Sequence, residues 1–395
     1  MPNAVPQSFP DDYHPVGVYV HIPFCLSRCD YCGFVSYPFN PMLEDAYVEG
    51  VLMEIENKKV SHLFGNYGSS QSVDTIYFGG GTPSVFSPAS IKRLINTIKN
   101  TFKPVHPLEI TMEINPGTYT DVEFSELYEF GVNRISIGAQ SLNDCELDSM
   151  NRPHSSSDFL KVFAGARSGG FNNISVDLLA GYPGQTIESV VDSIDRVIEL
   201  GPEHVSVYML DIKSGSKIEK RIKLNQDKPI DDDLVADMYE TICEKLCHQG
   251  FEQYEISNFC KQGMVSRHNV KYWTDKVFLG FGVAAHGMTG KARYSNVVNL
   301  NDYMVAVSSN GSAIESFTKM DPLTRFKDAM IMGLRMTQGV DFRIMSSRYG
   351  FDSYFFVKQT LLDLMGTGLF TMGRDTIKLT PKGMLLSNII FTRFV

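Results

Sequence analysis

The sequence lacks the long hydrophobic runs that mark membrane and exported proteins. Nowhere in its 395 residues do 18 apolar residues follow one another, and residues 1–15 carry neither a basic cluster nor a hydrophobic stretch. We therefore expect neither a membrane span nor a secretory signal, and we expect the chain to stay in the cytosol. An overall excess of positive charge is also absent, since the net charge of −9 argues against a general polyanion binder.

The composition excludes disordered, collagenous and coiled-coil chains. Apolar residues make up 43% and charged residues 21% of the sequence, as in an ordinary globular protein. The sequence shows no internal repeat and no low-complexity tract. A chain of this length allows two or three domains, or one large barrel with additions.

Cysteine is scarce, and its distribution is uneven. The chain has seven cysteines, an odd number that does not suit a disulfide framework. Three of them crowd together at Cys25, Cys29 and Cys32. Metal or redox chemistry explains such a cluster better than disulfides do. Cys243 and Cys247, four residues apart on one helix face, are expected to pack in the core, with a redox pair as the alternative, and the remaining two belong to no motif.

Short runs rich in Val, Ile, Tyr and Phe alternate with stretches whose apolar residues recur every three or four positions. This pattern is typical of β/α units around a parallel sheet. Helical patterns such as Met42–Val60 and Ile187–Leu200 separate the runs. The predicted strands are Gly17–Ile22, Thr75–Gly79, Leu108–Ile114, Arg134–Gly138, Ile174–Leu179 and Val205–Leu210. We predict an α/β fold with a partial (β/α)6 barrel over residues 15–210, after an N-terminal tail at residues 1–14.

The rhythm changes after residue 210. Residues 211–316 are predicted to extend the barrel, with a helix that ends near His248. Residues 317–395 are predicted to form a winged-helix-like α+β domain that is basic on balance. Its predicted elements are a helix at Thr324–Met336, a helix at Tyr354–Leu364, a hairpin turning at Gly373–Asp375 and a helix after Thr380-Pro381.

The three clustered cysteines follow the first predicted strand directly, with the spacing C-x3-C-x2-C. Three thiolates on one loop suit three irons of a cubane cluster and leave the fourth iron open for a substrate or cofactor. The alternative is a zinc ion completed by His21 or a distant cysteine, because structural zinc uses a closed set of four ligands.

The cysteine spacing, with Tyr31 before the last cysteine, resembles that of the radical S-adenosylmethionine (SAM) superfamily. The resemblance implies a 4Fe-4S cluster at Cys25, Cys29 and Cys32. It also implies that the amino and carboxylate groups of SAM chelate the open iron. In that superfamily, an electron from the reduced cluster cleaves SAM to a 5′-deoxyadenosyl radical.

The later strand ends fit the same resemblance. The triplet Gly79–Gly81 lets the backbone come close to a ligand with its N–H groups free. The next strand ends supply two carboxylates and an amide, and the segment Asn151–Pro153 supplies a guanidinium. Together these groups can hold a zwitterion. These residues resemble the SAM contacts of the coproporphyrinogen-oxidase-like subgroup. The contacts implied are Tyr19, Gly80, Gly81, Thr82, Glu113, Gln140, Arg152 and Asp177.

Two departures separate the sequence from oxygen-independent coproporphyrinogen III oxidase (HemN). Phe34 stands where the oxidase shows a further cysteine, and only 24 residues precede Cys25, fewer than in the oxidase. Both features match the HemW family, oxidase-like proteins described as heme chaperones. The segment Arg267–Trp273 contains H-N-x-x-Y-W, a pattern implicated in heme binding there, so the resemblance implies His268 as a heme ligand. The alternative is a histidine hydrogen-bonded within a loop, with Trp273 as a core anchor.

The first hypothesis is a cytoplasmic heme chaperone that binds a 4Fe-4S cluster, SAM and heme. It would deliver heme to respiratory hemoproteins at the membrane, would use an electron donor, and would not be an integral membrane protein. The resemblance gives the basic C-terminal domain a docking or lid function, so we expect no nucleic-acid binding.

Two other hypotheses stay open. One is a coproporphyrinogen III oxidase that decarboxylates porphyrinogen propionates by radical chemistry; the radical machinery is intact in the sequence, but this activity is not expected. The other is a paralogue that keeps the fold and has no heme role. His286, in a glycine-rich turn that recurs in the subgroup, receives no role.

Overall fold

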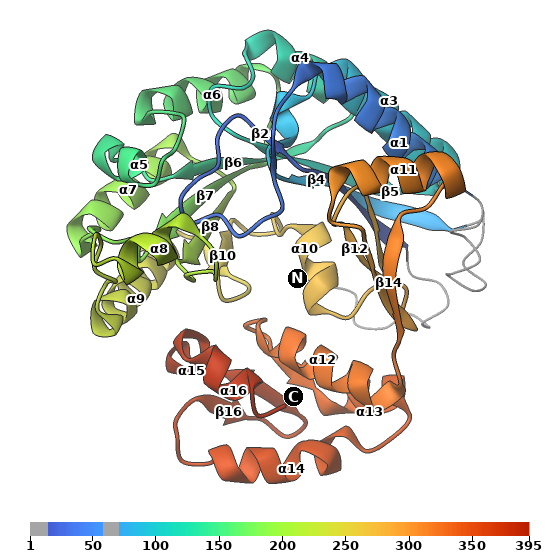
Figure 1. Ribbon diagram of the computed structural model, residues 1–395. Coiled ribbons are helices and arrows are strands. Elements are labelled where there is room, and N and C mark those ends of the chain that lie inside the picture. Colours follow the sequence, from blue (N-terminus) through green and yellow to red (C-terminus); the bar gives the residue numbers. More distant parts are fainter. Residues whose placement is uncertain (1–14, 58–70, 395) are drawn as a thin grey trace.

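The computed structural model describes residues 15–57 and 71–394, and its centre is one large sheet (Figure 1). The expected tail at residues 1–14 and the end of the helix expected to reach Val60 lie outside the described residues. Seven neighbouring strands of the sheet run parallel, which confirms the predicted α/β fold. Six of them were predicted, namely β1 (Val16–Ile22), β4 (Ser72–Gly80), β5 (Lys103–Ile114), β6 (Arg134–Gln140), β7 (Ile174–Ala180) and β8 (His204–Met209), and the seventh is β11 (Phe278–Phe281).

Helices form an arch over the outer face of these strands (Figure 1). The long ones are α1 (Glu44–Glu56), α3 (Pro88–Thr101), α4 (Asp121–Glu129), α6 (Ser156–Ser168) and α7 (Ile187–Leu200). Short helical segments lie between them: η1 (Pro41–Leu43), η2 (Pro83–Val85) and α5 (Asp144–Ser149). In α7, the side chain of Thr186 caps the first turn, and Gly201 ends the helix with the positive φ of 70° that a left-handed cap requires.

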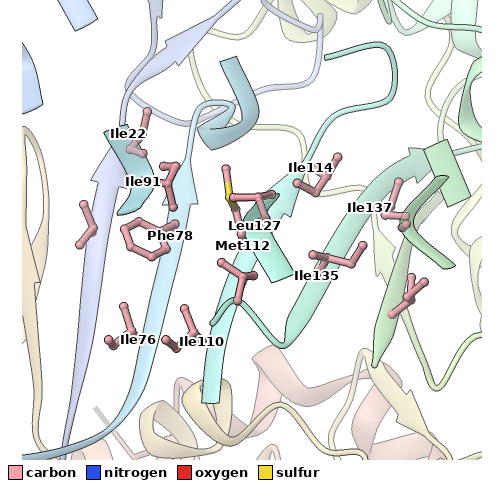
Figure 2. Packing of buried hydrophobic residues seen from close by; sticks show 14 of the residues in the cluster. Ile22, Ile76, Phe78, Ile91, Ile110, Met112, Ile114, Leu127, Ile135 and Ile137 are labelled. Carbon is pink, nitrogen blue, oxygen red and sulfur yellow. The ribbon is translucent and has the colours of Figure 1, made fainter. Parts of the chain in front are cut away.

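The core lies between the sheet and the arch. Figure 2 shows Phe78 of β4, Met112 of β5 and Ile135 of β6 packed with Ile91 of α3 and Leu127 of α4. All five side chains are fully buried. This close apolar contact makes the sheet a rigid frame, so the positions of its strand ends are fixed.

Residues 211–316 add strands to both edges of the same sheet. Beyond β1 follow β11 (Phe278–Phe281), β12 (His286–Met288), β13 (Ala292–Asn296) and β14 (Ile314–Lys319); beyond β8 follow β10 (Asn258–Cys260) and β9 (Glu252–Gln253). The helices of this part are α8 (Lys217–Lys223), α9 (Asp232–His248), α10 (Arg267–Trp273) and α11 (Leu300–Asn310). The helix expected to end near His248 is α9, and the boundary expected at residue 317 lies inside β14.

The C-terminal part has its own apolar cluster, which includes Phe326, Leu361 and Ile377. Its elements are α12 (Pro322–Leu334), β15 (Val340–Asp341), α13 (Phe342–Tyr349), α14 (Ser353–Leu364), β16 (Phe370–Met372), β17 (Thr376–Leu379), α15 (Pro381–Leu385) and α16 (Ser387–Phe391). The expected sequence of two helices, a hairpin and a helix is present, with α13 and β15 as additions. No helix of the described residues is long and apolar enough to span a bilayer.

A buried carboxylate joins α1 to the edge strands. Glu54 accepts hydrogen bonds from the Tyr303 hydroxyl (2.7 Å), the Gly282 N–H (2.8 Å) and the Asn296 amide (2.6 Å). Burial raises the pKa of Glu54 to about 7. The carboxylate therefore fixes the loop between β11 and β12 to the first helix.

We expect Glu54→Ala to lower the free energy of unfolding by about 3 kcal/mol, because three buried donors lose their acceptor. Glu56→Ala, on the exposed face of the same helix, should change it by less than about 0.5 kcal/mol. Because the folded-state pKa is raised, the advantage of the wild type over Glu54→Ala should be greatest below the ordinary value of 4.5 and should shrink as the pH rises to about 7. Urea unfolding across this pH range measures both effects, and equal stability of the two variants would contradict the role of Glu54.

Candidate active site

A cavity of about 480 Å³ opens at the carboxyl ends of the parallel strands. The loops of β/α units meet at this end of a barrel, and the volume is ordinary for a small-molecule site. Most residues expected to bind the cluster or SAM line the cavity. They are Cys25, Cys29, Cys32, Gly80, Gly81, Thr82, Glu113, Gln140, Arg152 and Asp177. Tyr19 and His268 are not among the lining residues.

The cysteines lie on a loop that is closed at its base. Strand β2 (Phe24–Cys25) pairs in parallel with β3 (Tyr37–Pro38), so the chain leaves and returns at one place. The Arg152 guanidinium donates to the Cys29 sulfur at 3.3 Å. This contact places a guanidinium against the sulfur and ties the middle of the loop to Arg152.

The three thiols fit a cluster better than they fit a single ion. Among the described residues, no three His, Cys, Asp or Glu side chains converge closely enough to hold one metal ion. In a cubane each thiolate binds its own iron, so Cys25, Cys29 and Cys32 need only border one space, as they do here. Burial raises the pKa of the Cys25 and Cys32 thiols, so bound iron would have to supply the positive charge that holds them as thiolates.

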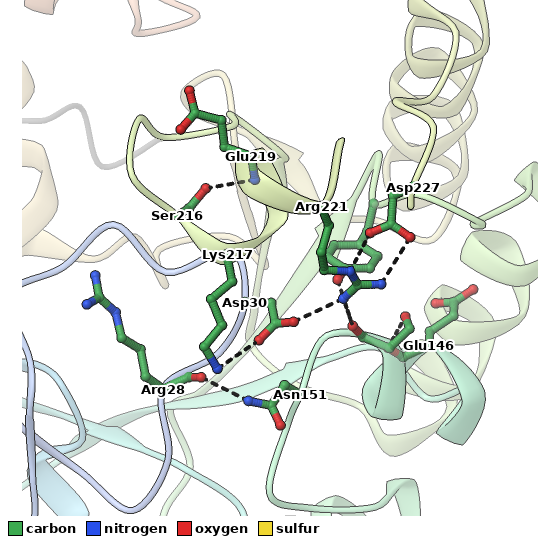
Figure 3. A network of polar contacts seen from close by, with 11 residues as sticks. Arg28, Asp30, Glu146, Asn151, Ser216, Lys217, Glu219, Arg221 and Asp227 are labelled. Carbon is green, nitrogen blue, oxygen red and sulfur yellow. Dashed lines mark hydrogen bonds and ion pairs between the residues drawn. The ribbon is translucent and has the colours of Figure 1, made fainter. Parts of the chain in front are cut away.

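Segments far away in the sequence hold the cysteine loop in place (Figure 3). Asp30 forms ion pairs with Arg221 at 3.0 Å and Lys217 at 3.3 Å, both on α8. Its backbone N–H donates to Met150 and its carbonyl accepts from Ile218. The loop is therefore fixed from two sides, between its first and last cysteines.

The glycines at the end of β4 are needed for close approach. A Cβ at Gly81 would lie 2.8 Å from the Phe24 carbonyl oxygen and 2.9 Å from the Cys25 sulfur. Gly80 has a φ of 121°, which side chains rarely adopt. The expectation that their N–H groups are free is wrong, because Gly80 donates to Glu113 and Gly81 donates to Ile22. These glycines instead let the cysteine loop lie against the strand end.

Two carboxylates line the cavity and are otherwise surrounded by protein. Glu113 accepts from the Tyr77 hydroxyl at 2.9 Å and from the Gly80 N–H at 3.1 Å. Burial raises the pKa of Glu113 to about 7, and burial also raises that of Asp177, which accepts from the Ser136 hydroxyl. Both carboxylates are therefore suited to meet a cationic or hydroxyl-bearing ligand.

Arg152 connects the cysteine loop to the sheet. Besides Cys29, its guanidinium donates to the Asn115 side chain at 2.9 Å and to the Gly138 carbonyl at 2.7 Å. Its Nε–H is buried and has no partner among the described residues, so the group retains capacity for an anionic ligand. Gln140, which also lines the cavity, has a positive φ of 65° that turns the chain at the end of β6.

Tyr19 and His268 lie beside each other behind the cavity wall. Tyr19 stacks on Tyr77, whose hydroxyl binds Glu113. His268 is fully buried, and its two ring nitrogens bind the Thr75 and Tyr272 hydroxyls, each at 2.9 Å. Burial lowers the pKa of His268 to about 3, so the ring is neutral. In this arrangement neither ring nitrogen is free for iron, and heme ligation by His268 stays a prediction that requires one of these bonds to break.

Two cavity residues were missed by sequence reasoning. Asn115 bridges Thr82 and Arg152, and its place directly after β5 could have identified it. Lys213 comes from the loop after β8 and lies against Gly33 in the cysteine loop. No motif marks Lys213, because only the fold brings that loop to the cavity.

The fold and the site together define a class of protein. The family model of the radical SAM superfamily matches residues 19–197, and that of the HemN C-terminal domain matches residues 320–386. The solved structure of coproporphyrinogen III oxidase (HemN) from Escherichia coli is similar, with a TM-score of 0.83 at 24% identity over 96% of this chain and 90% of that one. The chain belongs to the radical SAM superfamily.

Relatives define the family more narrowly. Heme chaperone HemW of Bacillus subtilis is 33% identical over 378 residues, which cover 95% of this chain and 98% of that protein. Heme chaperone HemW of Escherichia coli is 33% identical over 69% of this chain and 70% of its own. Radical S-adenosyl methionine domain-containing protein 1 of Mus musculus mitochondria is 33% identical over 82% of this chain and 74% of that protein. The chain belongs to the HemW family, which confirms the resemblance found in the sequence.

The anchoring of the cysteine loop can be tested on α8. Arg221→Ala removes the ion pair with Asp30, and we expect the loop amides at residues 26–36 to exchange hydrogen about 10-fold faster. Lys220→Ala, an exposed neighbour on the same helix, is the matched control. Hydrogen exchange read by mass spectrometry distinguishes them; unchanged exchange in Arg221→Ala would show that the loop is held by other contacts.

Proposed function

We propose that this chain is a heme chaperone on a radical SAM scaffold, which binds a 4Fe-4S cluster, SAM and heme in the cytoplasm and passes heme to respiratory hemoproteins at the membrane. The names of the HemW relatives support heme as the cargo. Membership of the radical SAM superfamily supports the cluster and SAM. The observation that carries the proposal is the single cavity that unites the three cysteines with all the expected SAM contacts except Tyr19.

In this proposal Cys25, Cys29 and Cys32 hold the cluster. When bound and reduced by an electron donor, the cluster supplies the electron with which this superfamily cleaves SAM. Arg152 donates to the Cys29 sulfur, and Gly81 leaves room for the cysteine loop.

The SAM contacts divide into direct and indirect ones. The residues that line the cavity would contact SAM directly: Gly80, Gly81, Thr82, Glu113, Gln140, Arg152 and Asp177. Tyr19 would act indirectly, since it stacks on Tyr77, which donates to Glu113. The two carboxylates suit the N–H donors of the amino group and the ribose hydroxyls, and the guanidinium suits the carboxylate of the ligand.

The alternative function is coproporphyrinogen oxidation. The likeness to HemN supports a shared fold. Phe34, where the oxidase has a further cysteine, lies on the cavity wall with 65% of its side chain exposed. An apolar ring at that place favours the chaperone over the oxidase.

Anaerobic assays of the cluster-loaded chain separate the two functions. If the chain is a heme chaperone, titration with heme should give a Soret band, and coproporphyrinogen III should not be converted in the presence of SAM and reductant. Formation of protoporphyrinogen IX at enzymatic rates would overturn the proposal in favour of the oxidase. If the chain neither binds heme nor converts coproporphyrinogen III, the third hypothesis, a paralogue without a heme role, would be favoured.

Cysteine substitutions test the cluster ligands. Cys25→Ala, Cys29→Ala and Cys32→Ala should each abolish incorporation of iron and sulfide, because three thiolates are the minimum for a cubane with one open iron. Cys145→Ala, an exposed cysteine outside the cavity, should incorporate both normally. Iron and sulfide analysis after anaerobic reconstitution gives the answer, and a normal cluster in any of the first three variants would refute the assignment.

The raised pKa of Glu113 predicts a pH dependence of SAM binding. Below its pKa of about 7 the carboxyl becomes neutral and accepts less strongly from the N–H and O–H donors of the ligand, so affinity should fall about 5-fold from pH 7 to pH 6. Glu113→Gln should bind more weakly at pH 8 and lose this dependence. Equilibrium dialysis with labelled SAM measures both, with exposed Glu129→Gln as control. An identical pH profile in Glu113→Gln would remove this residue from the SAM site.

A further inference from the structure

A second cavity, of about 380 Å³, lies apart from the cysteine loop. Its walls come from the end of α10 and the start of β11, from the pair β12 and β13, and from α12 of the C-terminal domain. Figure 1 shows α12 next to α10, at the side where the C-terminal domain meets the sheet. The volume is within the range of small-molecule and cofactor sites.

The pair β12 and β13 gives this cavity an imidazole and a thioether. His286 and Met288 are two residues apart on β12, so both side chains stand on the same face of the strand. His286 is exposed, and its imidazole makes no hydrogen bond with the described residues, in contrast to the ring of the fully buried His268. Met332, from α12, adds a second thioether to the lining. Imidazole and thioether groups are the usual axial ligands of heme iron in electron-transfer proteins.

Aromatic rings form another wall. Tyr272 and Trp273 come from α10, and Phe278 packs edge-on against Tyr272 with 4.6 Å between ring centroids. The indole nitrogen of Trp273 is buried without a hydrogen-bond partner among the described residues. Flat apolar rings cover a macrocycle well, and an unpaired N–H group invites a ligand acceptor.

Two cations complete the lining. Lys276 is partly buried and makes no ion pair with the described residues, and burial lowers its pKa. Arg293 is exposed and pairs with Asp328 at 3.1 Å. The other carboxylate of the lining, Asp275, already pairs with Arg325 at 3.0 Å. Lys276 is therefore the lining cation without an ion pair among the described residues, and Arg293 would meet an anionic ligand in exchange for Asp328.

We propose that this second cavity binds heme, with the His286 imidazole as axial ligand of the iron and with Lys276 and Arg293 facing the propionates. The inference rests on the proposed function, which makes heme the cargo. Trp273 and Phe278 cover the macrocycle. The H-N-x-x-Y-W segment then contributes through its two aromatic residues, and His268 is a positioning residue that holds the Tyr272 hydroxyl.

Titration of the full chain with ferric heme tests the axial ligand. His286→Ala should weaken heme binding at least about 10-fold and shift the Soret band, and added imidazole should restore the wild-type spectrum. His248→Ala, an exposed histidine on α9, should behave as the wild type. Because His286 is exposed, its loss should leave the circular dichroism spectrum unchanged.

The propionate contacts have their own probe. Lys276→Gln with Arg293→Gln should weaken heme binding but leave binding of heme dimethyl ester unchanged, because the ester has no charge to lose. Equal loss for both ligands would mean that the two cations do not meet the propionates.

The outcomes separate this inference from the function on which it rests. If the wild type binds no heme, the proposed function fails. If the wild type binds heme and His286→Ala keeps its affinity and spectrum, the function stands and the second cavity is not the site. If His268→Gln folds but no longer gives the Soret band of bound heme, and His286→Ala still gives it, His268 is the ligand and this inference is overturned.

Discussion

The parallel register of the central strands is the constraint on which the candidate active site depends. It pairs Ile22 with Gly80, Glu113 with Ser136, and Gly138 with Asp177. Side chains that are tens of residues apart in the sequence thus become neighbours at one edge of the sheet, before any loop is considered. The buried core between the sheet and the arch of helices prevents a slip of the register, because a shift of one residue would turn apolar side chains away from the helices.

The second constraint is the contact between the cysteine loop and the end of β4. Glycine at position 81 leaves space for Cys25, while ion pairs from α8 hold Asp30 on the other side of the loop. Cluster ligands must be held in position by surrounding groups if an iron is to remain open, and here two distant segments do so. The extension after β8 is therefore part of the site, although it contributes no expected ligand of the cluster or of SAM.

The sequence predicted the six parallel strands and the residues at their ends, since apolar periodicity and strand-end polar groups are local signals. It could not predict the edge strands β9 to β13, which are two to five residues long and exist because a neighbouring strand offers hydrogen bonds. It missed α13, a helix of eight residues between the two longer helices α12 and α14. It also misjudged the N–H groups of Gly80 and Gly81, because their acceptors, Glu113 and Ile22, come from other strands.

The two histidines show why a motif alone does not identify a ligand. His268 belongs to the recognisable pattern, yet its two ring nitrogens bind Thr75 and Tyr272, and its ring stacks on Tyr77 with 5.2 Å between centroids. It thereby connects the wall of the second cavity, at Tyr272, with the hydroxyl that binds Glu113 in the first. A residue at such a junction is constrained by packing and hydrogen bonding as strongly as a ligand is by its metal. A ligand is distinguished from a positioning residue by its exposure and by a ring nitrogen that is free to bind iron. Both properties come from the fold.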